Sequence, residues 1–309
     1  MTKFNEHKLP GASHNEWPDV AVIIPVYNQC SSLEICLQAI RTQTYNGNYN
    51  VIVIDNGSTE NLADLKERFC EVTFLAEAQI GSYSARNTGI ASTRAKILAF
   101  TDADCRPDAN WLHYGVGSLM SDSKIKLVGG RIDMILSGGR SHSLAELYDF
   151  ASGFQQRRNI TQRKFAATAN MITWRNLMDV LGPFDAQLRS AGDTEWGRRV
   201  FKAGHVLVYE DNAVVHHVAR TSRAEIFKKM KRTAGGARDL APTWPECIRD
   251  IIKHLAPPFP EAAELFIGQG RFLKNRQKLA ILIFAWEVRL RRVYERLRLQ
   301  ITGVPTPRS

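Results

Sequence analysis

The feature that most constrains the fold is a repeated alternation of short apolar runs with helix-like segments in the first third of the chain. The apolar runs have the length and composition of buried strands. They are 19–28, 50–59, 71–77 and 96–104. The segments between them are 31–43, 61–69 and 84–95. This alternation predicts an α/β fold with a Rossmann-like, mainly parallel sheet flanked by helices.

Beyond residue 110 the pattern is looser but still mixes strands and helices. We expect a strand with a Gly-Gly bend at 127–136, a helix at 143–159, a short strand and helix within 165–185, a helix at 193–204 and a strand, turn and strand at 205–220. From Ser222 onward the pattern is helical and basic.

Polar side chains follow three of the predicted strands. Asn28 closes the first run, Asp55 the second, and Asp102 and Asp104 the fourth. Because ligands of open α/β sheets bind beyond the carboxyl ends of the strands, these groups predict a binding site there.

Asp102 and Asp104 stand one residue apart, and i and i+2 side chains of an extended segment point the same way. Two adjacent carboxylates repel each other unless a cation lies beside them. Mg²⁺ or Mn²⁺ with a substrate phosphate would supply that cation. The alternative is ordinary turn chemistry, in which Asp is common.

Four other positions each allow a functional and a structural interpretation. Asp55 could accept an N–H from a nucleobase or belong to an Asn-Gly turn. Arg86 could contact a phosphate or be a solvated helix arginine. Asp193, with Glu195, could be a general base or a helix-start carboxylate stabilised by the dipole. His216 and His217 alternate in a strand, so only one can face a given site.

These residues occur within an ordered series of motifs that resembles the inverting family-2 glycosyltransferases of the GT-A fold. The resemblance spans roughly residues 19–220. Its motifs are VIIPVYN at 22–28, VIVIDNGST at 51–59, SARNTGI at 84–90, AFTDADC at 99–105, GPFD at 182–185, GDTEWGRR at 192–199 and VVHHVAR at 214–220. It implies a hexosyltransferase-type enzyme that moves a sugar from a nucleotide-diphosphate sugar to an acceptor hydroxyl, in polysaccharide or glycolipid synthesis.

The resemblance also implies roles for the residues that bind the nucleotide sugar. Pro25, Val26 and Tyr27 would line the nucleotide pocket. Asp55 would bind the base, and Arg86 would close over the base and diphosphate.

Further roles concern the metal and the chemistry. Asp102 would bind the ribose on the side that faces the metal, and Asp104 would ligate Mn²⁺ or Mg²⁺. Asp193 would be the catalytic base. His217 would help to hold the metal or diphosphate, with His216 as the alternative.

The chain departs from the family pattern at one position. The family usually has Glu-Asp before this helix, whereas Gly192 precedes Asp193 here. Glu195 could take part of the missing role.

The chain carries a formal net charge of +10, and all of the excess lies in the last ninety residues. Residues 220–309 hold 19 Lys and Arg against 8 Asp and Glu, whereas residues 1–219 hold 22 against 23. A basic, amphipathic helical tail fits either an interfacial contact with an anionic membrane or packing against the catalytic domain. We therefore expect a polar lead at 1–18, a catalytic domain at 19–220 and a basic helical region at 221–309.

The sequence favours a cytoplasmic protein, with the inner face of the membrane as a further option. The five cysteines form no CxxC pair, the N-terminus lacks an apolar signal region, and no run approaches the about 20 apolar residues of a membrane span. The expected partners are the donor and a saccharide or lipid-linked saccharide acceptor, with no nucleic acid.

Two other functions are consistent with the fold class. One is a catalytically inactive nucleotide-sugar-binding scaffold, although all four aspartates of the motifs are present. The other is a nucleotidyltransferase, which would need a glycine-rich signature near the first strand. The chain has no GxGxxG there and no GxxxxGK[ST], which argues against dinucleotide dehydrogenases and P-loop NTPases.

Overall fold

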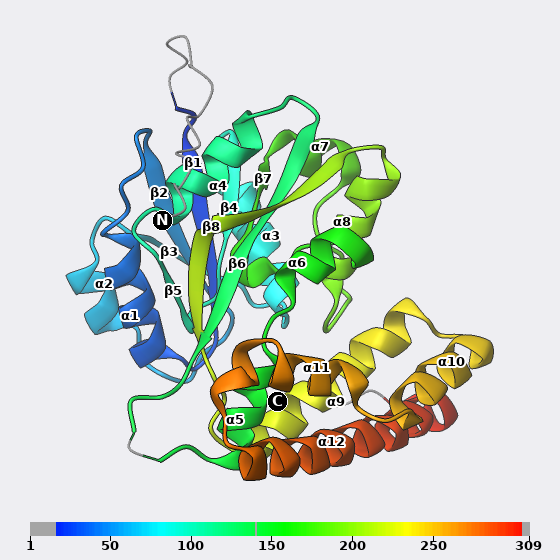
Figure 1. Ribbon diagram of the computed structural model, residues 1–309. Helices are drawn as coiled ribbons and strands as arrows, with labels where there is room; N and C mark the ends of the chain where they lie inside the picture. The colour runs from blue at the N-terminus through cyan, green and yellow to red at the C-terminus, as the bar shows by residue number, and fades with distance from the viewer. Residues whose placement is uncertain (1–16, 140, 305–309) are drawn as a thin grey trace, which may run out of the picture.

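The computed structural model describes residues 17–139 and 141–304, so most of the expected polar lead at 1–18 lies outside the described residues. Within the described residues, eight strands form one sheet in the order β3-β2-β1-β4-β7-β6-β8-β5. Helices cover both faces of the sheet, and a group of helices from the end of the chain lies below one of its edges (Figure 1).

The first half of the sheet has the predicted parallel order. β1 (Val20–Val26) lies between β2 (Tyr49–Asp55) and β4 (Ile97–Phe100), and β3 (Thr73–Ala76) extends the sheet beyond β2. The connecting helices are α1 (Cys30–Ile40), α2 (Ala63–Arg68) and α3 (Ser82–Ala91). Because these strands are parallel, their carboxyl ends meet at one edge, as the alternating pattern predicts.

The second half makes the sheet mixed. β7 (Met171–Trp174) is antiparallel to β4 and to β6 (Ile125–Ile135), and β5 (Cys105–Pro107) is antiparallel to β8 (Val206–Val218). Among the described strands of this half, only β6 and β8 pair in parallel.

Two expected elements differ in detail. The predicted strand, turn and strand at 205–220 form the single strand β8, in which a bulge shifts the register with β6 between the pairs Gly130–Glu210 and Ile132–Val215. The predicted helix at 143–159 ends early, because Gly153 adopts φ 38° after α5 (Leu144–Ser152). The chain then continues through α6 (Gln156–Arg158) and the π-turn η1 (Asn159–Arg163).

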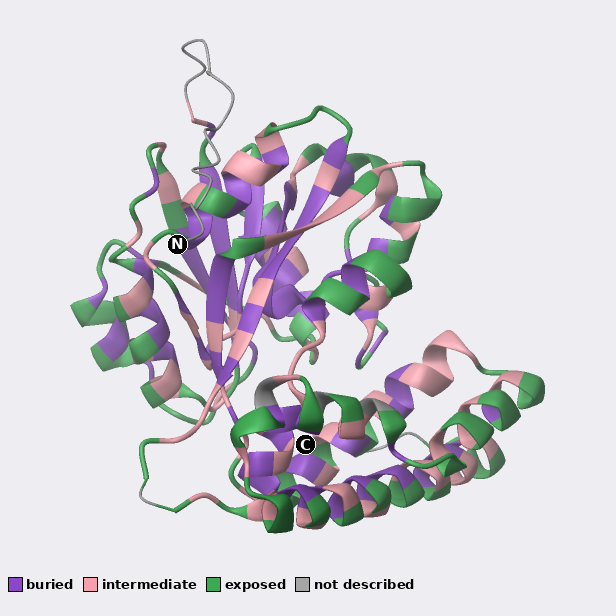
Figure 2. Ribbon diagram, viewed as in Figure 1, coloured by how far each residue is buried: buried purple, intermediate pink, exposed green. Residues whose placement is uncertain are grey.

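Apolar side chains alternate between the two faces of the sheet. On β1, Val20, Val22 and Ile24 pack toward α1 and α4 (Trp111–Met120), whereas Ala21 and Ile23 pack on the opposite face. That opposite face is covered by α3, by α7 (Asn176–Leu181) and by α8 (Gly192–Lys202). Figure 2 shows the resulting buried centre of the sheet.

The basic C-terminal region is helical, as the sequence predicts. It contains α9 (Arg223–Leu240), α10 (Trp244–Leu255), α11 (Phe259–Phe266), η3 (Gln269–Phe272) and α12 (Asn275–Thr302). The inner face of α12 packs on α5 and α9 through Ile281, Phe284 and Val288. α5 therefore packs with the C-terminal helices, although it precedes the boundary expected at residue 220, and that boundary stays a prediction. None of the described helices is both long and apolar enough to cross a bilayer.

Candidate active site at the carboxyl edge of the sheet

A cavity of about 1080 Å³ lies between the carboxyl ends of β1 and β4 and the helices α9 and α10. Most of the site residues expected from the sequence line it. They are Pro25, Val26, Tyr27, Arg86, Asp102, Asp104, Asp193 and His217. Three other candidates, Asp55, His216 and Glu195, are not among its lining residues.

Asp104 and His217 approach each other at one side of this cavity. Asp104 follows β4, and His217 lies near the end of β8, which pairs with β5 at Cys105. Asp104 Oδ2 is 3.4 Å from His217 Nε2, and the imidazole is only 2% exposed. The other ring nitrogen, Nδ1, is 2.9 Å from the carbonyl oxygen of Val218, so the proton belongs on Nδ1.

This tautomer leaves an acceptor nitrogen facing a carboxylate oxygen, and two acceptors need a cation or a second proton between them. Asp104, Cys105 and His217 offer ligand atoms within 4.8 Å of one another. Burial, with the nearby aspartates, raises the pKa of the Cys105 thiol well above its usual range, which disfavours the thiolate. A carboxylate and an imidazole remain, and this donor set is consistent with a divalent metal ion.

Asp102 has a different partner. Arg86 Nη2 donates to Asp102 Oδ1 at 2.5 Å, and the arginine side chain is 4% exposed. α3 holds this guanidinium below the surface of the cavity, 5.5 Å from the ring centroid of Tyr83. The two carboxylates that follow β4 therefore have different partners, since Arg86 neutralises Asp102 whereas Asp104 faces His217.

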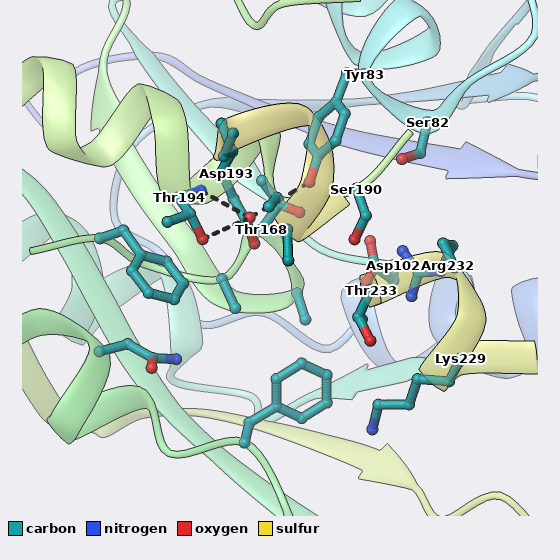
Figure 3. A pocket seen from close by; sticks show the side chains of 18 of the residues that line it. Ser82, Tyr83, Asp102, Thr168, Ser190, Asp193, Thr194, Lys229, Arg232 and Thr233 are labelled. Atoms are coloured by element: carbon teal, nitrogen blue, oxygen red, sulfur yellow. Dashed lines mark hydrogen bonds between the residues drawn. The ribbon is translucent and has the colours of Figure 1, made fainter. Parts of the chain in front are cut away.

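Asp193 lies in the first turn of α8 with its carboxylate in the cavity. Thr194 donates its backbone N–H to Asp193 Oδ1 at 2.8 Å, and the Tyr83 hydroxyl donates to the same oxygen at 3.4 Å (Figure 3). The surrounding protein withdraws this carboxyl from bulk water and raises its pKa, although the Thr194 N–H, Arg86 and Arg232 act in the opposite direction. A raised pKa suits a general base that must take up a proton.

Glu195, the other acidic residue in this turn, points elsewhere. Its carboxylate pairs with Arg199 one turn along α8, at 2.6 Å. Of the two carboxylates, only that of Asp193 lines the cavity.

Tyr83 occupies the space that a side chain at position 192, where the family usually has Glu, would need. A Cβ at position 192 would lie 2.8 Å from two atoms of the tyrosine ring, closer than any side chain tolerates. The ring of Tyr83 therefore fills the space beside residue 192, and its hydroxyl reaches Asp193.

The remaining candidates lie near the cavity without lining it. Asp55 ends β2 opposite Val26 and accepts the Ser58 N–H at 2.9 Å, as a turn residue does. His216 alternates to the face of β8 opposite His217 and pairs in register with Arg106.

Sequence reasoning missed the cations that the C-terminal helices bring to the site. Figure 3 shows Lys229, Arg232 and Thr233 of α9 facing the same space as Asp102 and Asp193. Lys229 and Arg232 are three residues apart on one helix face, a spacing visible in the sequence. The face of α9 that meets the cavity depends on packing, which the spacing does not reveal.

Comparisons with known proteins bear on this geometry. The model of "Glycosyl transferase family 2" matches residues 21–182. Glycosyltransferase AglE of Haloferax volcanii is 36% identical over 225 residues, which cover 71% of this chain and 73% of AglE. The chain belongs to glycosyl transferase family 2. Pre-mycofactocin glycosyltransferase of Mycobacterium tuberculosis is 28% identical over 78% of the chain, and the match spans about half (51%) of that relative.

Solved structures confirm the expected GT-A fold of this family-2 glycosyltransferase. The mannosyltransferase PcManGT of Pyrobaculum calidifontis, in complex with GDP-Man and Mn²⁺, superposes with a TM-score of 0.64 at 19% identity, over 94% of this chain and 88% of PcManGT. GalNAc-T7, with UDP, GalNAc and Mn²⁺, superposes with a TM-score of 0.56 at 16% identity, over 78% of this chain and 51% of its own.

The contact between Gly192 and Tyr83 can be tested by adding a single methyl group. Gly192→Ala should destabilise the protein by about 1–3 kcal/mol, because the new Cβ overlaps the tyrosine ring. Gly235→Ala is the matched control, because a Cβ at this α9 position meets no atom within 4 Å, and alanine should stabilise the helix there by up to about 1 kcal/mol. Urea denaturation of both variants measures the difference. Equal effects at the two positions would contradict the steric account.

Proposed function

We propose that this family-2 glycosyltransferase transfers a sugar from a nucleotide-diphosphate sugar to an acceptor hydroxyl with inversion of the anomeric centre. The observation that carries the proposal is one cavity that contains both the Asp104–His217 pair and the half-buried carboxylate of Asp193. Neither a catalytically inactive scaffold nor a nucleotidyltransferase has support in the comparisons.

In this proposal the donor lies along the carboxyl ends of β1 and β4. Pro25, Val26 and Tyr27 contact the nucleoside, and Asp55 binds the base from the end of β2. Asp104 and His217 would hold a divalent ion, Mn²⁺ or Mg²⁺. When bound, such an ion neutralises the negative charge that develops on the leaving diphosphate.

Arg86 has a role that differs from the one implied by the family resemblance. Its guanidinium lies beneath Asp102, and the ion pair is 2.5 Å long. We propose that Arg86 orients Asp102 toward the ribose instead of closing over the base. Arg232, whose charge acts on both Asp193 and Tyr83, is the better placed cation to face the diphosphate from α9.

Asp193 supplies the base in this mechanism. Its Oδ1 is held by the Thr194 N–H and the Tyr83 hydroxyl, which leaves Oδ2 for the hydroxyl of the acceptor. The carboxylate takes the proton of that hydroxyl while the oxygen attacks the anomeric carbon on the face opposite the leaving diphosphate. One displacement at that carbon inverts its configuration.

The outer surface of the C-terminal helices supports a contact with an anionic membrane. Exposed apolar side chains recur every three or four residues along α10 and α12, so each set forms one stripe. They are Trp244, Ile248, Ile252 and Leu255 on α10, and Leu279, Ile283, Trp286, Leu290 and Tyr294 on α12. Exposed cations lie in the same region, Arg271, Lys274, Arg276 and Arg291 among them. Apolar stripes among cations complement an anionic lipid surface, and we propose that the protein binds one peripherally.

The base assignment predicts opposite effects on activity and stability for Asp193→Asn. Transfer should fall about a hundredfold or more, because the amide cannot accept the proton. Binding of the nucleotide should persist. The raised pKa means that ionised Asp193 destabilises the fold as pH rises through that pKa. The substitution is therefore expected to raise the Tm at neutral pH, and this gain should vanish in acid.

Glu195→Gln is the matched control for the base, since it alters a carboxylate on the same helix turn that points to Arg199. Its transfer rate should stay within severalfold of the wild type. Loss of transfer in Glu195→Gln, with retention in Asp193→Asn, would reverse the assignment.

Asp104→Asn tests the metal site. UDP, GDP, dTDP and CDP are titrated in Mn²⁺ and in EDTA. The substitution should weaken nucleotide binding in Mn²⁺ at least about tenfold and leave binding in EDTA unchanged. Asp133→Asn changes a partly exposed carboxylate outside the cavity and should leave that affinity intact. A variant at residue 104 that binds nucleotide as the wild type does, with and without Mn²⁺, would remove the metal role.

Point substitutions test the membrane contact better than truncation, because the inner face of α12 belongs to the core. The triple variant Ile283→Gln, Trp286→Gln and Leu290→Gln should float about a hundredfold less with vesicles of phosphatidylcholine and phosphatidylglycerol. The matched control replaces three exposed apolar residues of the catalytic domain, Ile80, Val180 and Phe201, with Gln. Equal flotation of the two triple variants would refute the contact, as would wild-type protein that fails to float.

A further inference from the structure

The cavity continues past Asp193 to a group of cations that the proposed chemistry does not use. Arg163 ends η1, Arg198 lies on α8, and Lys253 lies on α10, and all three line the cavity. Arg198 Nε donates to the carbonyl oxygen of Arg163 at 3.4 Å, so these two are neighbours. Among the described residues, no carboxylate forms an ion pair with Arg163, Arg198 or Lys253. We call these three residues the cationic wall.

The members of the cationic wall repel one another. The pKa of Lys253 is lowered by partial burial and then by Arg163, which faces it from the catalytic domain. Arg163 is exposed in part, and its pKa is lowered by partial burial, by Arg158 and by Arg198. Cations from two separate parts of the fold thus line one cavity, and the opposite charge of Asp250 acts on Lys253 less than Arg163 does.

The carboxylates nearest to the wall already have other partners. Asp250 lies 3.4 Å from His254, 3.8 Å from Arg292 and 3.9 Å from Arg296. Glu246 accepts the Thr243 hydroxyl at 2.6 Å, and the Thr243 N–H, as a helix cap. The side chains of the protein therefore leave the wall positively charged.

The wall lies on the acceptor side of the proposed base. Thr194 and Arg198 are four residues apart on the same face of α8, so Arg198 stands about 6 Å further along the helix axis. The donor diphosphate is assigned to the Asp104–His217 pair, beyond the start of that helix. A negative group bound at the wall would belong to the molecule whose hydroxyl meets Asp193.

We propose that Arg163, Arg198 and Lys253 bind a phosphate group of the acceptor, an inference that rests on the proposed function. Three cations that converge from two sides suit a group with several oxygens and up to two negative charges, whereas a carboxylate offers two oxygens and one charge. The acceptor is then a saccharide whose phosphate or diphosphate lies close to the attacking hydroxyl.

The phosphate could belong to a lipid-linked saccharide or to a water-soluble phosphorylated one, and the fold favours the lipid-linked form. α10 carries Lys253 toward the cavity and, next to it in the chain, Ile252 on the exposed apolar stripe. α10 therefore carries a phosphate-binding side chain and an exposed apolar side chain at adjacent positions.

The experiment titrates the full chain in EDTA, which removes metal-dependent binding at Asp104, with geranyl phosphate, inorganic phosphate and geraniol. Calorimetry should give tighter binding for geranyl phosphate than for either of the others. Arg163→Gln and Lys253→Gln should each weaken it about tenfold, the value of one charge-assisted hydrogen bond. Lys202→Gln is the matched control, since this exposed cation ends α8, lies outside the cavity and should bind as the wild type does.

The outcomes separate this inference from the proposed function. Wild-type affinity for geranyl phosphate in both Arg163→Gln and Lys253→Gln overturns the phosphate site, as does equal binding of geranyl phosphate and geraniol. Equal binding of inorganic and geranyl phosphate keeps the site and assigns it to a water-soluble acceptor. Both wall variants should bind nucleoside diphosphate with Mn²⁺ as the wild type does. If the proposed donor site is wrong, the titrations of Asp104→Asn will show it without involving the wall residues. Circular-dichroism melting confirms that each variant is folded.

Discussion

The geometry of the cavity depends on one buried carboxylate, Asp149, which joins the catalytic sheet to the C-terminal helices. Its oxygens accept the Lys229 ammonium at 2.9 Å, the Arg220 guanidinium at 3.1 Å and the Arg220 N–H at 3.0 Å. Burial alone would raise the pKa of Asp149, but the two cations outweigh it and hold the pKa at about 2. This cluster joins α5 to the segment after β8 and to α9. Gly236 then lets α9 approach the loop before α8, where any Cβ would meet Ser190 at 2.7 Å.

At the carboxyl edge of the sheet, too, a charged side chain of one element is compensated by a side chain of another element. Arg86 of α3 neutralises Asp102, which leaves Asp104 to face His217 of β8. The bulge in β8 contributes to this arrangement, because it resets the register so that His217, and not His216, lies buried beside Asp104. Each acidic side chain beyond β4 is therefore held by another element, Asp102 by the preceding helix α3 and Asp104 by the distant strand β8.

This dependence explains which features the sequence could predict. The parallel strands and the residues at their ends follow from local apolar runs and their order, so Asp102 and Asp104 could be named in advance. Asp193 is predicted from its place at a helix start and from the family resemblance. The antiparallel half could not, since the pairing of β4 with β7 joins segments about seventy residues apart that carry no local signal of direction. Asp211 and Asn212 have the composition of a turn, yet neighbouring strands hold them in a bulge. The contact of Tyr83 with Gly192 likewise joins distant positions.

The net charge of the tail illustrates the same limit at the level of function. Composition locates the positive excess in the last ninety residues and suggests an anionic partner, but it does not divide the cations between surfaces. In the fold, Lys229 pairs with Asp149 and Lys253 lines the cavity, whereas Arg276 and Arg291 lie exposed on α12 outside it. One compositional bias is thus divided between two surfaces of different geometry. Both would meet negative phosphates, those of the bilayer surface outside and that of the acceptor within. An acceptor anchored in that bilayer would satisfy both sets of cations at once.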